Sequence, residues 1–409
     1  MTFNKRFRMT EEDAIVYARD KLDLFTPKDD LDCSEIGDGN INYVFRVFSK
    51  TSDRSIIIKQ ADDNTRASSL SLSTDRNRIE AELLNIEKRY AGDMVPKLYA
   101  YDPVMSCFIM EDLTSYEIMR NALIKETVFP KFAEQISEFM AATLANTTDF
   151  VLSPKAKKDM VKHFINPDMC DISERLVYTD PYIKPVGKGE IADANLDYVN
   201  TDLQKDHSLL CEVAKLKLDF LNNAQALIHG DLHTGSIFIK PDSIKVIDPE
   251  FGFFGPIGYD VGNVIANLIF AWVRSMVISA RNEEKNKIFQ KWIREAIQDS
   301  FDLFYAKFQI ILAEKTQDIL FKSPKLQSWY LSTIMADSAG VAGLEINRRI
   351  IGTAKVKDIV SLEVPEERSR AERILMESAR CFIMDRSNYK TGSDFTNTVE
   401  YFEKNINLI

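Results

Sequence analysis

Two acid-bearing loops within residues 228–251 constrain this chain more than any other feature. The end of one apolar strand leads into Asp231, and a second short strand leads into Asp248 and Glu250. The segment between them has the length and pattern of one short hairpin over 237–247, with its turn at Pro241-Asp242. Such a hairpin delivers both loops to the same end of one site.

Carboxylates arranged in this way suit phosphoryl transfer. One carboxylate must meet the acceptor hydroxyl, and others must hold magnesium against the phosphates of ATP. Asp231, within His-Gly-Asp-Leu-His, is the candidate catalytic base. Asp248 and Glu250 alternate along an extended segment, so both can face one Mg²⁺ ion, which prefers hard oxygen ligands. The apolar flanks of both acids argue against ordinary solvated turns.

Other polar residues of the first loop are expected to support Asp231. Ser236 stands where a protein kinase places a magnesium-binding asparagine. Because serine is a poorer magnesium ligand, we expect Glu250 to supply what Ser236 cannot. His229 and His233 are expected to shape the loop through hydrogen bonds and not to catalyse.

Two upstream features suit a nucleotide. Lys59 ends an apolar strand, where kinases place the lysine that contacts the α- and β-phosphates. Glu80 or Glu82 on the following helix can pair with it, and the spacing favours Glu80. A glycine-containing turn precedes that strand; it lets backbone N–H groups approach phosphates, although it also suits a plain hairpin. The turn consists of Gly37, Asp38, Gly39 and Asn40.

A tandem arginine pair, Arg348-Arg349, ends a predicted helix just before Gly352. Guanidinium forks suit phosphate oxygens and sugar hydroxyls. Cations at a helix end also stabilise the last carbonyls. The residues alone leave both interpretations open.

Length and periodicity predict an α+β protein with two lobes. A chain of 409 residues is too long for one compact core. Strand patterns at 33–60, 97–101 and 107–110 lie among helical patterns at 11–25 and 76–89, and almost everything later reads as helix. We expect a small β-rich N-lobe over 1–113 that binds nucleotide, and a larger, mainly helical C-lobe over 114–409. Residues 150–205 predict short helices that cap the site, or an insertion.

Composition excludes several partners. The net charge of −10 argues against nucleic acid and anionic membranes. Five scattered cysteines without a CxxC pair fit reduced thiols in a cytoplasmic protein. No signal-peptide pattern is expected at 1–10. The apolar stretch 261–280 contains Asn263, Asn267 and Arg274, which predicts a buried helix and not a membrane span.

The motifs together resemble the methylthioribose kinase family, among the small-molecule kinases related to aminoglycoside and choline phosphotransferases. The likeness runs in order over about residues 30–355, and Ser236 is similar to that family's own variant. The matching strings are Glu35-Ile36-Gly37-Asp38-Gly39-Asn40, Lys59-Gln60, Met110-Glu111-Asp112-Leu113, the run 229–237, Asp248-Pro249-Glu250-Phe251 and Arg348-Arg349-x-Ile351-Gly352.

The resemblance implies a bilobal, protein-kinase-like homodimer that uses ATP and Mg²⁺ to phosphorylate the 1-hydroxyl of S-methyl-5-thioribose in methionine salvage. It also implies a role for each motif. Asp231 would be the catalytic base, Asp248 and Glu250 the magnesium ligands, Lys59 and the turn 37–40 the phosphate ligands, Met110 and Glu111 with the adjacent backbone the adenine contacts, and Arg348 and Arg349 the sugar or phosphoryl contacts.

One segment departs from the family. Its loop after the lysine carries a Trp-Pro pair that folds over the site, and here Leu70-Ser71 stands in that place. The acceptor is therefore open to 5-deoxyribose, ribose or another alcohol such as choline, homoserine or an aminoglycoside. Choline requires an aromatic cage and an aminoglycoside an acidic pocket, whereas paired arginines disfavour a cation. A catalytically dead nucleotide-binding protein is disfavoured, because every core acid and Lys59 are present.

Overall fold

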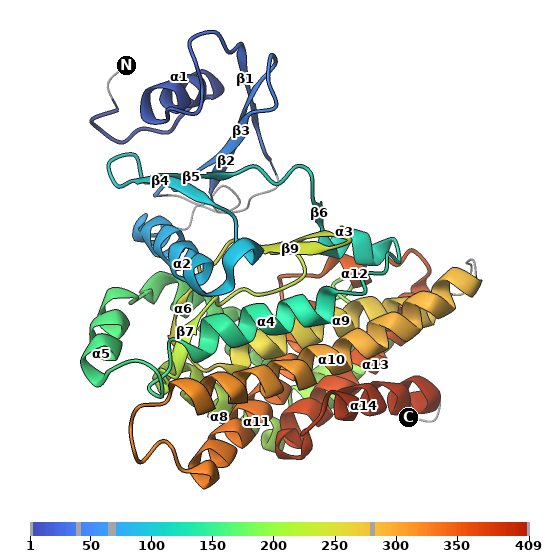
Figure 1. Cartoon of the computed structure of the whole chain (residues 1–409). Coiled ribbons are helices and arrows are strands. Elements are labelled where there is room, and N and C mark those ends of the chain that lie inside the picture. The colour runs from blue at the N-terminus through green and yellow to red at the C-terminus, as the bar shows by residue number, and fades with distance from the viewer. Residues whose placement is uncertain (1–2, 38–41, 64–70, 279–282, 407–409) are drawn as a thin grey trace.

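A five-stranded antiparallel sheet forms the N-lobe of the computed structural model, which describes residues 3–37, 42–63, 71–278 and 283–406 (Figure 1). The strand order is β1-β2-β3-β5-β4, so neighbouring hairpins build most of the sheet. The strands are β1 (Leu31–Glu35), β2 (Tyr43–Ser49), β3 (Ser55–Gln60), β4 (Leu98–Asp102) and β5 (Cys107–Glu111). The strands predicted for 33–60, 97–101 and 107–110 are confirmed.

The central strand β3 is apolar on both faces because each face meets a different core. Ile56 and Ile58 pack in a small core under α1 (Glu11–Lys21). Ile57 points the other way, into the main core that α2 (Asp75–Ala91) shares. A strand covered on both faces reads as a continuous hydrophobic run. Lys59 follows this run two residues after Ile57, and therefore on the face that is turned to the main core.

Helices make up most of the remainder, below the sheet in Figure 1. Helix α9 runs through their middle and packs on α10 and α11, while α11 also packs on α13. These helices are α3 (Met119–Ile124), α4 (Phe132–Ala145), α8 (His207–Asn222), α9 (Gly258–Val277), α10 (Glu283–Lys315), α11 (Pro324–Ile350), α12 (Lys357–Val360), α13 (Pro365–Met384) and α14 (Gly392–Asn405). The small β-sheet lobe and the larger helical lobe agree with the predicted fold class, and the boundary at residue 113 stays a prediction.

Helix α9 is buried along almost its whole length, as predicted for 261–280. A Cβ atom at Gly262 would lie 2.6 Å from the carbonyl oxygen of Ser338, so glycine permits the close approach of α11. Two amides of α9 donate back to carbonyls of the same helix, that of Asn263 to Tyr259 at 2.7 Å and that of Asn267 to Asn263 at 2.9 Å. Within the described ranges, no helix is both long and apolar enough to cross a membrane.

The segment 150–205, for which the sequence left short capping helices or an insertion open, forms short helical pieces, and prolines stand in the first turns of three of them. Their capping role stays a prediction. The helix predicted for 11–25 is shorter, because the chain turns to extended backbone at Leu22. Of three short strands, Ala226–Ile228 is the strand end expected before the Asp231 loop, whereas Glu117–Ile118 and Phe253–Gly255 escaped the sequence analysis because they are too brief to show a period of two. The pieces are α5 (Pro154–His163), α6 (Pro167–Ser173), α7 (Asp180–Ile183) and π-helical turns at Glu174–Thr179 and Tyr198–Leu203; the strands are β6 (Glu117–Ile118), β7 (Ala226–Ile228) and β10 (Phe253–Gly255).

Candidate active site

Two strand pairs hold the acid-bearing loops side by side. The predicted hairpin exists as β8 (Ile237–Lys240) and β9 (Ser243–Val246). Strand β7 leads into the Asp231 loop, and it pairs antiparallel with β10, which follows the Asp248 loop. Each loop therefore begins and ends on the same two strand pairs. This arrangement brings together the two halves of the site that the sequence predicted.

Gly230 allows the two loops to touch. Its φ is +81°, a left-handed conformation that glycine adopts readily, and a Cβ there would lie 2.3 Å from the carbonyl oxygen of Phe251. Asp248 also has a left-handed φ of 65°, which is strained for a residue with a side chain. Such strain is maintained where surrounding contacts fix a functional side chain.

Asp260 anchors the catalytic loop and was missed by the sequence analysis. From the first turn of α9, its carboxylate accepts hydrogen bonds from the N–H of His229 at 2.7 Å and of Gly230 at 2.9 Å. Burial raises the pKa of Asp260 to about 7, against the pull of these two N–H groups. The only available signal was an acid followed by a long apolar helix, which is common in ordinary helices.

Asp231 remains ionised although it is deeply placed. Burial alone would raise its pKa, but His233 and the guanidiniums of Arg348 and Arg349 outweigh burial and hold the pKa well below its usual range. The Nε2 atom of His233 lies 3.4 Å from Asp231 Oδ2. A carboxylate of such low basicity is suited to orienting a hydroxyl and accepting its proton late in the reaction.

Lys59 of the sheet lobe forms ion pairs with Glu80 and with Asp248 of the second acid-bearing loop. Its Nζ donates to Glu80 Oε1 at 2.6 Å, the partner that the spacing favoured, and to Asp248 Oδ1 at 2.7 Å. Glu82 lies elsewhere and pairs with Arg78. Burial would lower the pKa of Lys59, but the surrounding carboxylates raise it, so the lysine stays charged.

Glu250 is held through an amide and a buried arginine that the sequence analysis did not identify. Asn42 donates from Nδ2 to Glu250 Oε2 at 2.8 Å, and its Oδ1 accepts from Arg76 Nη2 at 3.1 Å. Arg76 also donates to the carbonyls of Ser73 and Asp62 at 2.8 and 2.9 Å. Arg76 fixes the orientation of the Asn42 amide. That amide binds Oε2 of Glu250, so Oε1 stays available for a cation.

The two carboxylates fit a divalent cation. Burial and the neighbouring Asp248 charge raise the pKa of Glu250, and a cation between these acids would relieve their repulsion. In the part of the chain that is described, no three metal-type side chains cluster. Magnesium is commonly bound by one or two carboxylates together with substrate phosphates, so two acids suffice.

The predicted adenine contacts lie at the end of β5. Met110 is buried in the main core. The carboxylate of Glu111 is occupied, because it accepts from the N–H of Lys97 at 3.0 Å and from Lys245 Nζ at 2.9 Å. The N–H of Leu113 hydrogen-bonds no described residue. The backbone next to Glu111, and not its side chain, is therefore left for a ligand.

Arg348 and Arg349 end α11, and both turn back to Glu345 on the same helix. Arg348 Nη1 lies 3.1 Å from Glu345 Oε2, and Arg349 Nε lies 2.7 Å from Glu345 Oε1. Glu345 is almost fully buried, and the two guanidiniums keep its pKa low despite the cost of burial. Both arginines also lower the pKa of Asp231, so they lie within electrostatic reach of that carboxylate, and their role as substrate contacts stays a prediction.

Part of the predicted site falls outside the described residues. These residues are Asp38, Gly39, Asn40 and Leu70. Their neighbours Gly37 and Ser71 are described. Ser236 is buried, with its Oγ 3.1 Å from His233 Nδ1.

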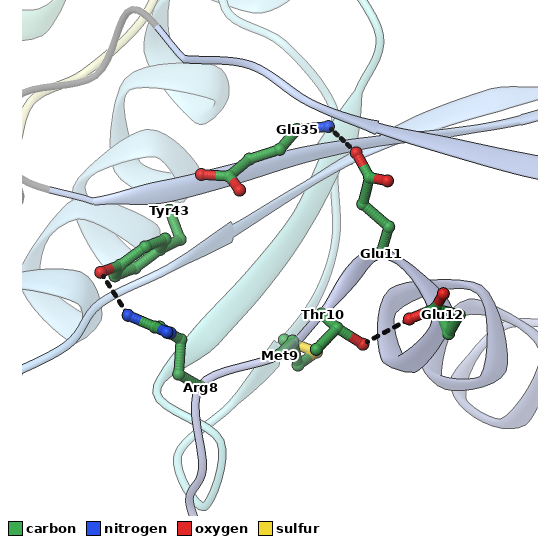
Figure 2. A pocket seen from close by; sticks show the side chains of 7 residues that line it. All are labelled: Arg8, Met9, Thr10, Glu11, Glu12, Glu35 and Tyr43. Carbon is green, nitrogen blue, oxygen red and sulfur yellow. Dashed lines mark hydrogen bonds between the residues drawn. The ribbon is translucent and has the colours of Figure 1, made fainter.

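A separate hollow of about 530 Å³ lies between α1 and the β1–β2 hairpin (Figure 2). Its polar groups mostly bind each other: Arg8 donates to the Tyr43 hydroxyl at 3.2 Å, and the N–H of Glu35 donates to Glu11 at 2.8 Å. None of the candidate phosphotransfer residues lines this hollow.

The two-lobed fold, with a lysine–carboxylate site facing an acid-bearing loop, defines a phosphotransferase, and residues 127–289 match the phosphotransferase enzyme family. The methylthioribose kinase of Cronobacter sakazakii is 36% identical over 96% of this chain and 98% of its own length. That of Geobacillus thermodenitrificans is 37% identical over 95% of each chain. The chain belongs to the methylthioribose kinase family. A crystal structure of choline kinase from Cryptosporidium parvum, 13% identical, covers 97% of this chain and 96% of its own with a TM-score of 0.46.

Proposed function

We propose that this protein transfers the γ-phosphoryl group of ATP to the 1-hydroxyl of S-methyl-5-thioribose, a step of methionine salvage. The observation that carries the proposal is Asp231, kept ionised by His233, Arg348 and Arg349, next to a lysine–carboxylate site for phosphates. Relatives named methylthioribose kinase, similar over nearly the whole chain, support this acceptor.

On the donor side, each residue has a task that its contacts support. Lys59 holds the α- and β-phosphates and is itself held by Glu80. The main chain beside Glu111, with the N–H of Leu113, holds adenine. A phosphate-covering role for the turn 37–40 is proposed from its glycine-containing sequence alone, since Gly37 is its one described residue. Asp248 and Glu250 hold Mg²⁺, which when bound neutralises charge on the β- and γ-phosphates. The fixed amide of Asn42 keeps Glu250 turned toward that position.

On the acceptor side, Asp231 orients the sugar hydroxyl in line with the γ-phosphate. Proton transfer comes late, because the pKa of Asp231 is low and phosphoryl transfer proceeds through a loose transition state that needs little nucleophile activation. Arg348 and Arg349 bind the sugar or the transferring group and stabilise charge on its oxygens. Their own charge is balanced by Glu345, so an uncharged acceptor is accommodated.

The test is ATP-to-ADP turnover, with Mg²⁺, on methylthioribose, 5-deoxyribose, ribose, choline and an aminoglycoside. A kcat/KM for methylthioribose at least about a hundredfold above that for ribose, which is about 2.7 kcal/mol of discrimination, supports the proposal. Equal use of 5-deoxyribose or ribose would show that Leu70-Ser71, where the family has Trp-Pro, has moved the substrate preference. Turnover of choline or the aminoglycoside alone would contradict a sugar acceptor.

We further propose a cytoplasmic homodimer that binds neither nucleic acid nor membranes. The net charge of −10 and the scattered cysteines support this environment. Sedimentation of the purified protein tests the dimer, and a monomer at micromolar concentration would contradict it.

A further inference from the structure

Arg120 lies against the catalytic loop, although no motif pointed to it. It belongs to the first turn of α3, and its backbone N–H donates to the carbonyl of Thr234 at 3.0 Å. Its Nη2 donates to Asn267 Oδ1 at 2.9 Å, and the same oxygen lies 3.3 Å from the hydroxyl of Thr234. Backbone and side chain together fix Arg120 to the loop that carries Asp231.

The guanidinium of Arg120 lies close to Gly235 of the same loop. A Cβ atom at Gly235 would lie 2.9 Å from the His233 ring and 3.2 Å from Arg120 Nη1, so glycine leaves space for both side chains. Burial and the charge of Arg349 lower the pKa of Arg120, while Asp358, Glu345 and Asp231 oppose them. Arg120 is therefore within electrostatic reach of the catalytic acid and of one arginine of the tandem pair.

Three guanidiniums meet here with donors that remain unused. The buried Nε of Arg120, Nε of Arg348 and Nη2 of Arg349 find no hydrogen-bond acceptor among the described residues. Arg120 Nε faces Asp358 Oδ2 at 3.5 Å, and both carboxylate oxygens of Asp358 also lack a hydrogen bond among the described residues, so these two groups can satisfy each other. The donors that need an outside acceptor are Arg348 Nε, Arg349 Nη2 and Arg120 Nη1, the last of which hydrogen-bonds none of the described residues. Buried donors in native proteins almost always have acceptors, so this cluster is arranged for a ligand that supplies oxygen atoms.

The charges indicate what kind of ligand that is. Arg120, Arg348 and Arg349 face three carboxylates, those of Asp231, Glu345 and Asp358. With the positive charges balanced from within, an anionic acceptor would gain little, whereas neutral hydroxyl groups can still accept the unused N–H donors.

We propose that Arg120 is a substrate-binding residue whose guanidinium donates to ring hydroxyls of the acceptor sugar, as a third arginine beside Arg348 and Arg349. The inference rests on the proposed function, because it takes the acceptor to be a sugar. It assigns to α3 part of the discrimination between sugars with and without vicinal hydroxyl groups.

The experiment compares wild type with Arg120→Met and Arg120→Lys, using the preferred sugar and its 2-deoxy and 3-deoxy analogues. We expect Arg120→Met to raise the acceptor KM at least tenfold while the KM for Mg·ATP changes less than threefold. In wild type, at least one deoxy analogue should have a lower affinity than the preferred sugar. In Arg120→Met the difference in affinity between these two sugars should be small, since the missing hydroxyl and the missing guanidinium would be partners. Arg120→Lys keeps the charge without the planar fork, and should recover part of the acceptor affinity.

Arg370→Met is the matched control. The buried Nε of Arg370 also has no hydrogen-bond partner among the described residues, and its Nη2 donates to Glu403 Oε1 on α14 at 2.7 Å, with no hydrogen bond or ion pair to the described residues of the Arg120 cluster. We expect its acceptor KM to stay within twofold of wild type. If Arg120→Met fails to fold, as circular dichroism would show, the Arg120→Lys comparison carries the same test.

The inference is overturned if both Arg120 variants keep the wild-type acceptor KM, or if every deoxy analogue loses as much affinity in the variants as in wild type. Failure of the proposed function looks different, because wild type would then phosphorylate none of the sugars, whatever stands at position 120. If wild type uses a non-sugar alcohol, the sugar-hydroxyl role of Arg120 is overturned with it.

Discussion

The donor and acceptor halves of the active site are built differently. In the donor half, partners come from opposite lobes: Lys59 and Asn42 of the sheet lobe contact Asp248 and Glu250 of the helical lobe. In the acceptor half, the groups around Asp231 all follow β5 in the chain, and Arg348 and Arg349 share Glu345 within one helix turn.

The donor half therefore depends on how the two lobes are placed, and the acceptor half on contacts within one lobe. A donor site made of cross-lobe pairs is complete only when the lobes are correctly placed. Its geometry can therefore change when nucleotide and metal bind. An acceptor site fixed by local contacts in one lobe is preorganised whether or not nucleotide is bound. Substitutions in the two halves should therefore affect different kinetic constants.

The largest effect is expected for Asp231→Ala, which removes the group that orients the acceptor hydroxyl. We expect kcat to fall by about 10³-fold or more while ATP binding survives, because Asp231 contacts the acceptor half only. Steady-state kinetics and nucleotide calorimetry measure the two effects. Asp242→Ala on the exposed hairpin turn is the control and should keep wild-type turnover. Substantial turnover by the Asp231 variant would identify the wrong base.

Asp248→Asn tests the donor half next. Asparagine tolerates the left-handed φ of this position, so the change removes a charge with little backbone cost. We expect kcat/KM for Mg·ATP to fall about 10²-fold and the acceptor KM to change little. Melting with ADP and with Mg·ADP provides a second measurement. A magnesium-dependent rise in Tm equal to that of wild type would exclude Asp248 as a ligand.

Arg76→Met should weaken the same half indirectly, through Asn42 and Glu250. We expect about a tenfold higher magnesium concentration for half-maximal activity, with kcat at saturating metal close to wild type. Arg78→Met on the same helix is the control, since Arg78 pairs with Asp75 and Glu82 outside the site. Equal magnesium dependence in both variants would show that Arg76 does not position Glu250.

The pH dependence sharpens the role of the acceptor arginines. Because the pKa of Asp231 is depressed, its ionised form persists as pH falls. Protonation of this group should therefore cause no fall in kcat, that is, no acidic limb of the profile, above about pH 4. Arg349→Gln removes one stabilising charge and should move that limb toward higher pH. Profiles of kcat at saturating Mg·ATP and sugar measure both. A limb near pH 6 in wild type that Arg349→Gln leaves in place would contradict this assignment.

The smallest effect is expected for Ser236→Ala. Ser236 contacts His233, which lies beside Asp231, so its hydroxyl acts at one remove from the reaction. We expect kcat within about threefold of wild type and an unchanged magnesium dependence, consistent with a loss below about 0.7 kcal/mol. A hundredfold loss with a higher magnesium requirement would make Ser236 a metal ligand and revise the donor half.

Local pattern was enough to find the elements that carry chemistry. The alternation around β2 and β3, the hairpin after Asp231 and the apolar helix α9 each follow from the period of buried side chains. The ion pair of Lys59 with Glu80 followed from strand and helix spacing. The brief strands β6 and β10 could not be found, because two or three residues show no period, whereas β7 was expected from the apolar run that leads into the Asp231 loop.

The sequence by itself determined the order of the motifs and the family to which the chain belongs, because these depend on residue type and spacing. It also predicts the roles of Asp231, Asp248 and Glu250. Only the tertiary structure decided which distant groups support them. Asp260, Arg76 and Arg120 act through contacts with residues far away in the chain, and no local pattern distinguishes them from ordinary helix charges. Their place is set by how helices α2, α3 and α9 pack around the two loops.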